Sequence, residues 1–173
     1  MLDDDGLFER LCLEGFQSGL SWLTILRKRE AFRDAFAGFR IAEVASFGSR
    51  DVKRLMADAG IVRNRRKIDA AIENARAAIA LADDGDSLSG LVWSYRPRRH
   101  RAPRSAADLP ATTAESIALA AGLKARGFRF VGPTTAYALM QACGLVNDHI
   151  SGCAVRGEVS DAQRAATRML PAR

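Results

Sequence analysis

The sequence predicts an all-α protein, organised as one domain or as two small helical lobes that share a core. Apolar residues recur at helical spacings along most of the 173 residues, as Ile68, Ala71, Ile72, Ala75 and Ile79 do. No segment alternates apolar and polar residues in the way of a half-buried strand. Hydrophobic residues make up 48% of the chain, which is enough for a substantial core and argues against global disorder.

Start and stop signals divide the first half of the chain into five expected helices. Acidic residues, Ser and Asn mark the starts, because their side chains accept hydrogen bonds from first-turn N–H groups, and glycine marks the stops. The expected helices run from the acidic cap at 3–5 to about 15, from 21 to about 36, and over 52–59, 64–82 and 88–93.

The second half is expected to hold an exposed loop, two helices and a tail. Residues 96–110 contain three of the five prolines and five arginines, so they predict a loop. Thr112 followed by Glu115 is a capping-box pattern for a helix that runs to about residue 125. Another helix is expected from residue 133 or 134 to about 143. We expect residues 1–153 to form the domain and residues 154–173 to form a basic, flexible or loosely helical tail.

The net charge indicates the class of binding partner, and the cysteines indicate the redox state of the compartment. Lys and Arg number 26 against 20 Asp and Glu, and the net charge of +6 favours a polyanionic partner. Cys12, Cys143 and Cys153 are odd in number and widely spaced, which predicts a reducing cytoplasm rather than a disulfide framework. No apolar run has the length of a membrane span, and the acidic first residues do not resemble a secretory signal, so no membrane partner is expected.

The most informative local pattern is LKARGFRFVGPTTAY at residues 123–137. One helix is expected to end at Gly127 and the next to open after Gly132, which resembles a helix–hairpin–helix element. In such an element the backbone N–H groups of a tight turn, together with a helix N-terminus, approach a DNA phosphate. Three cations lie beside the turn: Lys124, Arg126 and Arg129. An ordinary turn between packed helices fits the same spacing.

Glu14 lies near the end of the first expected helix, close to its apolar face. That face passes through Leu11 and Gly15, and a buried carboxylate is costly unless it is paired or employed. Gly15 and Gly19 permit close approach of a backbone or a ligand, and Trp22 can form the wall of a pocket. The alternative is a partly exposed glutamate beside two turn glycines and a core tryptophan.

Four blocks, in this order, resemble the DNA-3-methyladenine glycosylase I family. They are LFERLCLEG at 7–15 continuing to LSW at 20–22, DAGIVRNR at 58–65, RGFRFVGPTT at 126–135 and MQACGLVNDH at 140–149. The resemblance covers about residues 5–153, and several long blocks in order are more specific than any single motif. It implies a helix–hairpin–helix DNA glycosylase fold with two helical lobes around a base-binding cleft. It also implies a monomer that acts on double-stranded DNA containing alkylated adenine.

The resemblance assigns roles to individual residues. Glu14 matches the glutamate that contacts the flipped, alkylated adenine, and Trp22 matches an aromatic residue that stacks on that base. Gly19 and Leu20 lie in the loop expected to fill the gap in the duplex. The hairpin and its flanking cations supply the other DNA-binding residues: Lys124, Arg126, Gly127, Arg129, Gly132 and Thr134.

These roles form a coherent reaction, with Glu14 as the catalytic residue. A base must leave the stack before an enzyme can act on it. N3-methylation makes adenine cationic and weakens its glycosidic bond, so a carboxylate beside an aromatic wall selects the damaged base. Water is expected to attack the sugar, which predicts a monofunctional glycosylase of base excision repair. The alternative is a catalytically inactive DNA-binding remnant, and base release that depends on Glu14 distinguishes the two.

The resemblance also implies a structural zinc site, of which this sequence holds two ligands. His149 and Cys153 match the two C-terminal ligands. The family's other Cys and His ligands, and two pocket tyrosines, belong to a segment before Leu7 that has no counterpart here. Structural zinc takes four protein ligands, so we expect weak binding or none unless the fold recruits His100 or Cys12. A misplaced start codon or truncated gene is the expected cause, and a genuine shortened paralogue is the alternative.

Asp148 has two possible roles. It follows the hairpin, near where related helix–hairpin–helix glycosylases place a catalytic aspartate, although the 3-methyladenine family is not thought to use one there. A direct role in the pocket is one possibility. A cap for the turn that positions His149 is the other.

Overall fold

The computed structural model describes residues 1–169, and in that range it contains ten α-helices, two short 3₁₀ helices and no strand. This confirms the all-α prediction. The α-helices are α1 Asp4–Gln17, α2 Trp22–Arg27, α3 Arg29–Ala35, α4 Ile41–Ala45, α5 Ser49–Ala57, α6 Arg65–Asp83, α7 Leu88–Ser94, α8 Ala114–Ala125, α9 Pro133–Cys143 and α10 Arg156–Met169. The 3₁₀ helices are η1 Ala37–Phe39 and η2 Ala106–Asp108. None of the described helices is long and apolar enough to span a bilayer.

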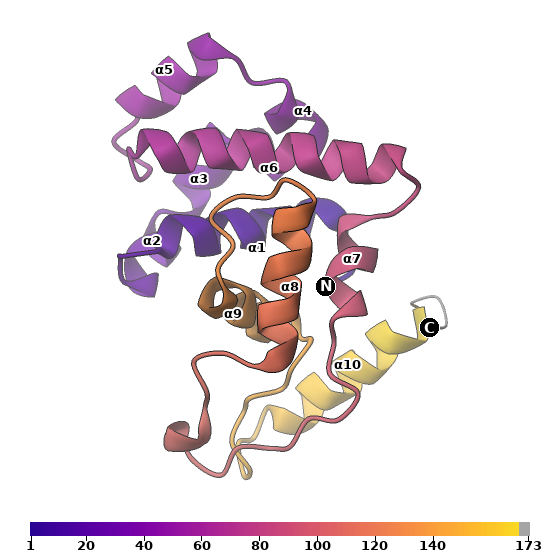
Figure 1. Ribbon diagram of the computed structural model, residues 1–173. Coiled ribbons are helices and arrows are strands. Elements are labelled where there is room, and N and C mark those ends of the chain that lie inside the picture. The colour runs from indigo at the N-terminus through magenta and orange to yellow at the C-terminus, as the bar shows by residue number, and fades with distance from the viewer. Residues whose placement is uncertain (170–173) are drawn as a thin grey trace.

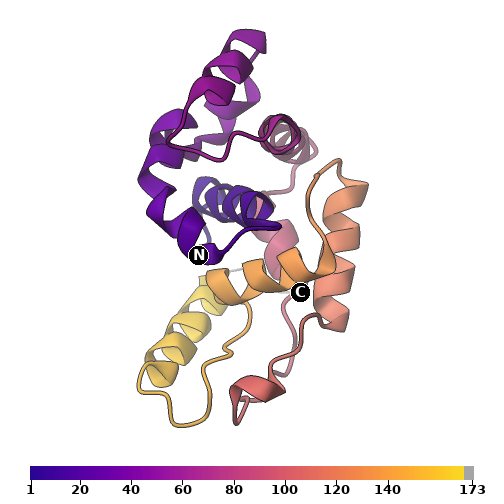
Figure 2. The ribbon, with the colours of Figure 1, turned by 90° about the vertical axis from the view of Figure 1, so that its left-hand side faces the viewer.

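α1 lies at the centre of the molecule, with α2–α6 on one side and α7–α10 on the other (Figures 1 and 2). It contacts α2, α4, α6, α7 and α9. α8 and α9 pack against each other, and the turn between them lies beside α6 (Figure 1). The buried apolar residues of both halves form one continuous cluster. Side chains of α1 can therefore contact both halves of the protein.

Most helices begin at the residues that the sequence marks. Asp3 accepts a hydrogen bond from the N–H of Gly6 and begins α1, and Asn64 accepts one from the N–H of Lys67 and begins α6. The capping box of α8 lies one residue later than expected, since Thr113 caps the helix and pairs with Ser116. The α8–turn–α9 boundaries agree with the prediction.

The apolar stretch that begins at Ser21 is not one helix. It divides into α2 and α3 at Lys28, which has a non-helical backbone. The Lys28 ammonium donates to the carbonyl oxygens of Ala59 and Gly60, at 2.9 and 3.0 Å. This contact with a segment some thirty residues away explains why local periodicity does not reveal the break.

A cluster of phenylalanines fixes α1 against α3, η1 and the segment after α4. Its members are Phe8, Phe16, Phe32, Phe36, Phe39 and Phe47, and neighbouring ring centroids lie 4.6 to 6.3 Å apart. Such pairs add about 0.5–1.5 kcal/mol each beyond the burial of their area. Because Phe8 and Phe16 flank Glu14 on α1, the cluster fixes the backbone that carries this glutamate.

The segment expected to be a flexible or loosely helical tail forms the helix α10 over most of its length. Asn147 donates through its side-chain amide to the Arg156 carbonyl at 3.0 Å and contacts the Ser160 hydroxyl at 2.9 Å. Gln163 donates to the carbonyl of Gly144 at 2.8 Å, and Ala166 packs against the core. These contacts join α10 to the segment after α9, which a polar, alanine-rich sequence does not indicate by itself. Residues 170–173 of the expected tail lie outside the described residues.

Candidate functional site

Glu14 lies in the last turn of α1 and is buried, with 6% of its surface exposed. Burial raises the pKa of its carboxyl to about 7, and the charge of Arg10, one turn earlier, acts in the opposite direction. Within residues 1–169 no hydrogen bond or ion pair reaches this carboxylate. The Nε atom of Arg10 is also buried without a hydrogen-bond partner in that range. Buried polar groups are rarely left unpaired, so this face of α1 is suited to a polar ligand.

A second buried glutamate on the same helix shows the contrast. Glu9 receives hydrogen bonds from Arg29 at 2.6 Å and from Arg33 at 3.0 and 3.1 Å. Burial acts to raise the pKa of Glu9, but the two guanidinium groups outweigh it and lower the pKa. Glu9 therefore links α1 to α3, whereas Glu14 remains available.

Glu14 faces the interface between α1 and α9. Burial is the main reason why the pKa of Cys143, in the last turn of α9, is raised to about 12. The charges of Glu14, Arg10 and the Met1 amino group also act on that thiol. The Met1 amino group donates to the Cys143 carbonyl at 3.3 Å. The charges of Glu14, Arg10 and the Met1 amino group thus all act at the end of α9 that carries Cys143.

Residues 18–21 form the turn from α1 to α2, and its tip is exposed. Gly19 has a φ of +81°, which favours glycine, and Leu20 next to it is 38% exposed. Trp22 is the first residue of α2 and packs half-buried against the core. Glu14, on α1, therefore precedes this turn, and Trp22, on α2, follows it.

Lys67 on α6 fixes this turn. Its side chain is buried, and its ammonium donates to the carbonyl oxygens of Phe16 at 2.8 Å and Ser18 at 2.6 Å. These carbonyls lie at the C-terminal end of α1, where the helix itself supplies no donors and a positive charge is favourable. Burial lowers the pKa of Lys67.

The turn between α8 and α9 is held by a second buried residue of α6. Asn74 accepts a hydrogen bond from the Arg129 N–H at 2.6 Å and donates to the Arg129 carbonyl at 3.1 Å. Gly127 has a φ of +88°, and Phe130 has a positive φ of 55°, which is uncommon for a residue with a side chain. Gly132 begins α9 without a side-chain cap, and Pro133 follows it. First-turn N–H groups of α9 therefore have no side-chain acceptor.

α6 thus fixes two turns through residues seven positions apart, or about two helical turns. Between them Gly15 of α1 and Phe130 approach so closely that a Cβ at Gly15 would lie 3.6 Å from the Phe130 Cβ. The cavity where α1, α6 and Phe130 meet has a volume of only about 10 Å³. The space between Gly15 and Phe130 is therefore filled by packed atoms.

Two of the three cations expected to bind DNA are paired with carboxylates. Arg129 forms an ion pair with Glu73 at 2.6 Å, and Arg126 lies 3.6 Å from Asp86. Lys124 is exposed in the last turn of α8. The positive charge of the turn is therefore partly offset, and its backbone N–H groups carry more of any attraction for phosphate.

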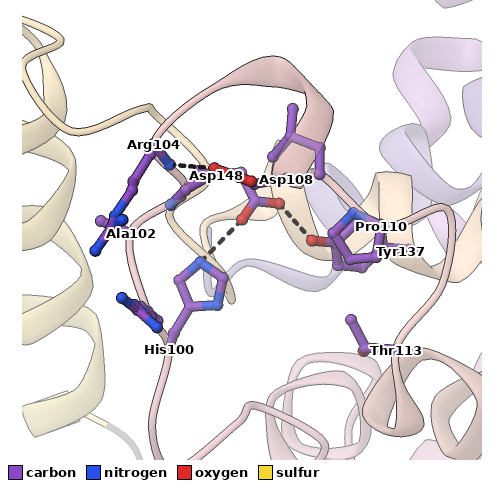
Figure 3. A pocket seen from close by; sticks show the side chains of 11 residues that line it. His100, Ala102, Arg104, Asp108, Pro110, Thr113, Tyr137 and Asp148 are labelled. Carbon is purple, nitrogen blue, oxygen red and sulfur yellow. Dashed lines mark hydrogen bonds and ion pairs between the residues drawn. The ribbon is translucent and has the colours of Figure 1, made fainter.

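Asp148 does not cap the turn at His149, because the N–H of His149 donates to the side chain of Asn147 at 3.3 Å instead. The Asp148 carboxylate accepts hydrogen bonds from the Tyr137 hydroxyl at 2.6 Å and the Gln141 amide at 2.7 Å. His100 Nε2 lies 2.9 Å from its other oxygen, and the group borders a cavity of about 440 Å³ (Figure 3). Both carboxylate oxygens are occupied, so Asp148 ties α9 to the loop of residues 96–110.

The expected zinc ligands meet but do not complete a site. His149 Nδ1 and Cys153 Sγ lie 3.5 Å apart. That separation suits one edge of a tetrahedron with Zn–S of about 2.3 Å and Zn–N of about 2.0 Å. His100 pairs with Asp148, and Cys12 is buried in the core, so neither joins them. Residues 1–169 bring together no group of three or more His, Cys, Asp or Glu side chains able to hold a metal ion. The described residues therefore do not fit a structural zinc.

Lys67 and Asn74 are functional candidates that sequence reasoning missed. Both lie on the buried face of α6, where a lysine and an asparagine interrupt a stripe of alanine and isoleucine. Buried polar side chains in such a stripe indicate specific partners. The sequence carries that signal, but the partners lie 49 to 55 residues away and only the fold reveals them.

The chain matches known proteins over most of its length. A sequence model of the methyladenine glycosylase family matches residues 1–156. DNA-3-methyladenine glycosylase 1 from Escherichia coli is 47% identical over 153 residues, which cover 87% of this chain and 82% of that protein. DNA-3-methyladenine glycosylase from Haemophilus influenzae is 42% identical over 154 residues, which cover 87% and 83%. A solved structure of 3-methyladenine DNA glycosylase I from Staphylococcus aureus, described as the structural basis of 3-methyladenine recognition, matches this chain with a TM-score of 0.85 and is 34% identical to it. It covers 90% of this chain and 84% of that one. The all-helical fold agrees with these sequence and structural similarities, and the chain belongs to the methyladenine glycosylase family.

Proposed function

We propose that the protein is a monofunctional DNA glycosylase that hydrolyses the N-glycosidic bond of 3-methyladenine in alkylated DNA. The observation that carries the proposal is Glu14, a buried carboxylate without a partner among the described residues. The relatives named for 3-methyladenine support the choice of base. The three free cysteines are consistent with the cytoplasm as the place of action.

Glu14 favours the methylated base over normal adenine because the methylated base is positively charged. N3-methyladenine in DNA is cationic, so an ionised carboxylate in a poorly solvated site attracts it more strongly than it attracts neutral adenine. Arg10 lowers the pKa of Glu14 against the effect of burial and so favours the ionised form. Trp22 stacks on the flipped base, which adds cation–π attraction. Water then attacks the sugar carbon as the N-glycosidic bond breaks; the electron pair of that bond leaves with the base as neutral 3-methyladenine, and the proton of the water passes to solvent.

The two turns fixed by α6 are assigned to DNA. The α8–turn–α9 segment acts as a helix–hairpin–helix element, in which Gly127, Gly132 and Thr134 bring backbone N–H groups to a phosphate. Gly19 and Leu20 enter the duplex where the base has left. Double-stranded DNA is therefore the partner, and a monomer suffices because both turns belong to one chain. Lys67 and Asn74 set the spacing between the two DNA contacts.

Release of free 3-methyladenine from methylated duplex DNA tests the function. The 173-residue chain is expected to release the base and to leave the abasic strand uncut, since no lysine amine takes part. Binding of DNA by the folded chain without any release would instead favour the inactive remnant.

Asn74→Ala is expected to weaken binding of duplex DNA by about tenfold, because the turn at Arg129 loses both hydrogen bonds that fix it. The rate of base release at saturating enzyme should change much less. Fluorescence anisotropy and single-turnover kinetics measure the two effects. Asn74→Asp keeps an acceptor for the Arg129 N–H, so its affinity for DNA should lie between those of the wild type and Asn74→Ala. An equal loss of both quantities would contradict a role confined to the turn.

A further inference from the structure

A large groove lies between α10 and the loop of residues 96–110. Its volume is about 670 Å³. Among the residues that the structure describes, five arginines line it: Arg96, Arg98, Arg156, Arg164 and Arg168. None of the described lining residues is an aspartate or a glutamate.

The positive charge of this groove is little offset within the described chain. Arg164 pairs with Asp161, which does not line the groove. Arg96 and Arg156 donate to neutral acceptors, the Thr167 hydroxyl and the carbonyl of Asn147. Arg98 and Arg168 form no ion pair or hydrogen bond in residues 1–169. Like charges held together without counter-charges repel one another, so a polyanion that neutralises them gains free energy.

The groove is separate from the DNA contacts proposed above. The α8–turn–α9 turn lies at one end of α8, whereas α10 and the loop lie towards the other end (Figures 1 and 2). The family match ends at residue 156, where α10 begins, so the residues of the α10 wall other than Arg156 lie beyond it.

We propose that this groove is a second binding surface for the phosphate backbone of DNA. Arg164 and Arg168 are one helical turn apart, about 6 Å, and Arg156 is two further turns away, so their charges follow a line along α10. Ser160, Gln163 and Thr167 add hydrogen-bonding groups between them. A lipid surface fits less well, because α10 has no stripe of large apolar side chains to enter a membrane.

Such a groove binds without reading sequence, since phosphate contacts fix position and carry no base information. It would hold the protein on undamaged DNA by counterion release while the Glu14 site samples bases. The groove arginines are then expected to affect affinity and its salt dependence, and to leave the step of base release unchanged.

The test compares two double variants that each remove two exposed positive charges. Arg98→Ala with Arg168→Ala neutralises the groove, and Arg50→Ala with Lys53→Ala on α5 is the matched control, at the far end of the molecule (Figure 1). Fluorescence anisotropy with a short undamaged duplex is recorded between about 50 and 200 mM salt. The groove variant should bind about tenfold more weakly at low salt, and its slope of log affinity against log salt should be shallower by about 1 to 2.

An unchanged slope in the groove variant, or a change no larger than that of the α5 control, would overturn the proposal. Binding to vesicles of anionic phospholipid that depends on Arg98 and Arg168 while DNA binding does not would overturn it as well. Single-turnover release of 3-methyladenine at saturating enzyme should equal the wild-type rate. Because undamaged DNA is the probe, failure of the chain to release any base would refute the proposed function and leave this comparison valid.

Discussion

Glu14→Gln is expected to slow the release of 3-methyladenine by about two to three orders of magnitude, the usual loss when one electrostatic contact to the reacting group is removed. The amide fills the same space but carries no charge for the cationic base. Single-turnover kinetics on methylated DNA measures the effect. Glu43→Gln removes an exposed carboxylate from α4 and should leave the rate unchanged. A rate for Glu14→Gln within a few-fold of wild type would show that the carboxylate is not the selecting group.

The same residue predicts how activity depends on pH. The pKa of Glu14 is raised to about 7, so its ionised fraction increases as the pH rises through neutrality. Base release by the wild-type chain should therefore rise with pH across this range, and Glu14→Gln should lose that dependence. A wild-type profile that is flat from about pH 6 to pH 8 would contradict the assignment.

Stability should change in the opposite direction. The pKa of Glu14 is about 7 in the folded protein and 4.5 for an ordinary glutamate, so folding favours the neutral carboxyl. The stability from this group is complete below the lower value and is lost as the pH rises through the upper one, at a cost of about 3 kcal/mol. Glu14→Gln should thus raise the free energy of unfolding at about pH 8 and change it little at about pH 4. Urea unfolding at the two pH values tests this. A higher free energy of unfolding for Glu14→Gln at about pH 8 alone would show that the ionised carboxylate lowers the stability of the folded protein.

Lys67→Met is expected to slow base release by about ten- to a hundredfold, because loss of the ammonium leaves the carbonyls of Phe16 and Ser18 without their donor. Hydrogen bonds from charged groups contribute about 1.5–3 kcal/mol each, so the turn that carries Gly19 and Leu20 should become mobile. Affinity for undamaged DNA should fall only a few-fold, since the α8–turn–α9 contact remains. A fluorescent base opposite or beside the lesion should report less flipping.

The control for Lys67→Met is Arg66→Met, which removes a charge from the adjacent, exposed position. Arg66→Met should retain the wild-type rate. Kinetics are compared well below the midpoint of thermal unfolding of each variant, so that a loss of stability does not appear as a loss of rate. If Lys67→Met lowers thermal stability but flips and releases the base normally, Lys67 is a structural residue and not a positioning one.

Local sequence determined the helices and the turn from α8 to α9. Asp3, Asn64 and Gly144 mark helix ends through hydrogen bonds and backbone angles that involve only a few neighbouring residues. For the same reason the sequence singled out Glu14, since a carboxylate at an apolar helical position is visible in the local pattern. Its burial and raised pKa agree with that reading.

The tertiary structure decided what the polar residues do. It divided the stretch after Ser21 at Lys28, ordered α10 and placed Asp148 between Tyr137 and His100. Each of these outcomes depends on a hydrogen bond or ion pair between segments far apart in the chain, and a local pattern does not specify such partners. Glu9 and Glu14 show the difference within one helix. Both are glutamates of α1, but two arginines from α3 reach Glu9 and not Glu14, and no other residue in the range 1–169 forms a hydrogen bond or ion pair with Glu14.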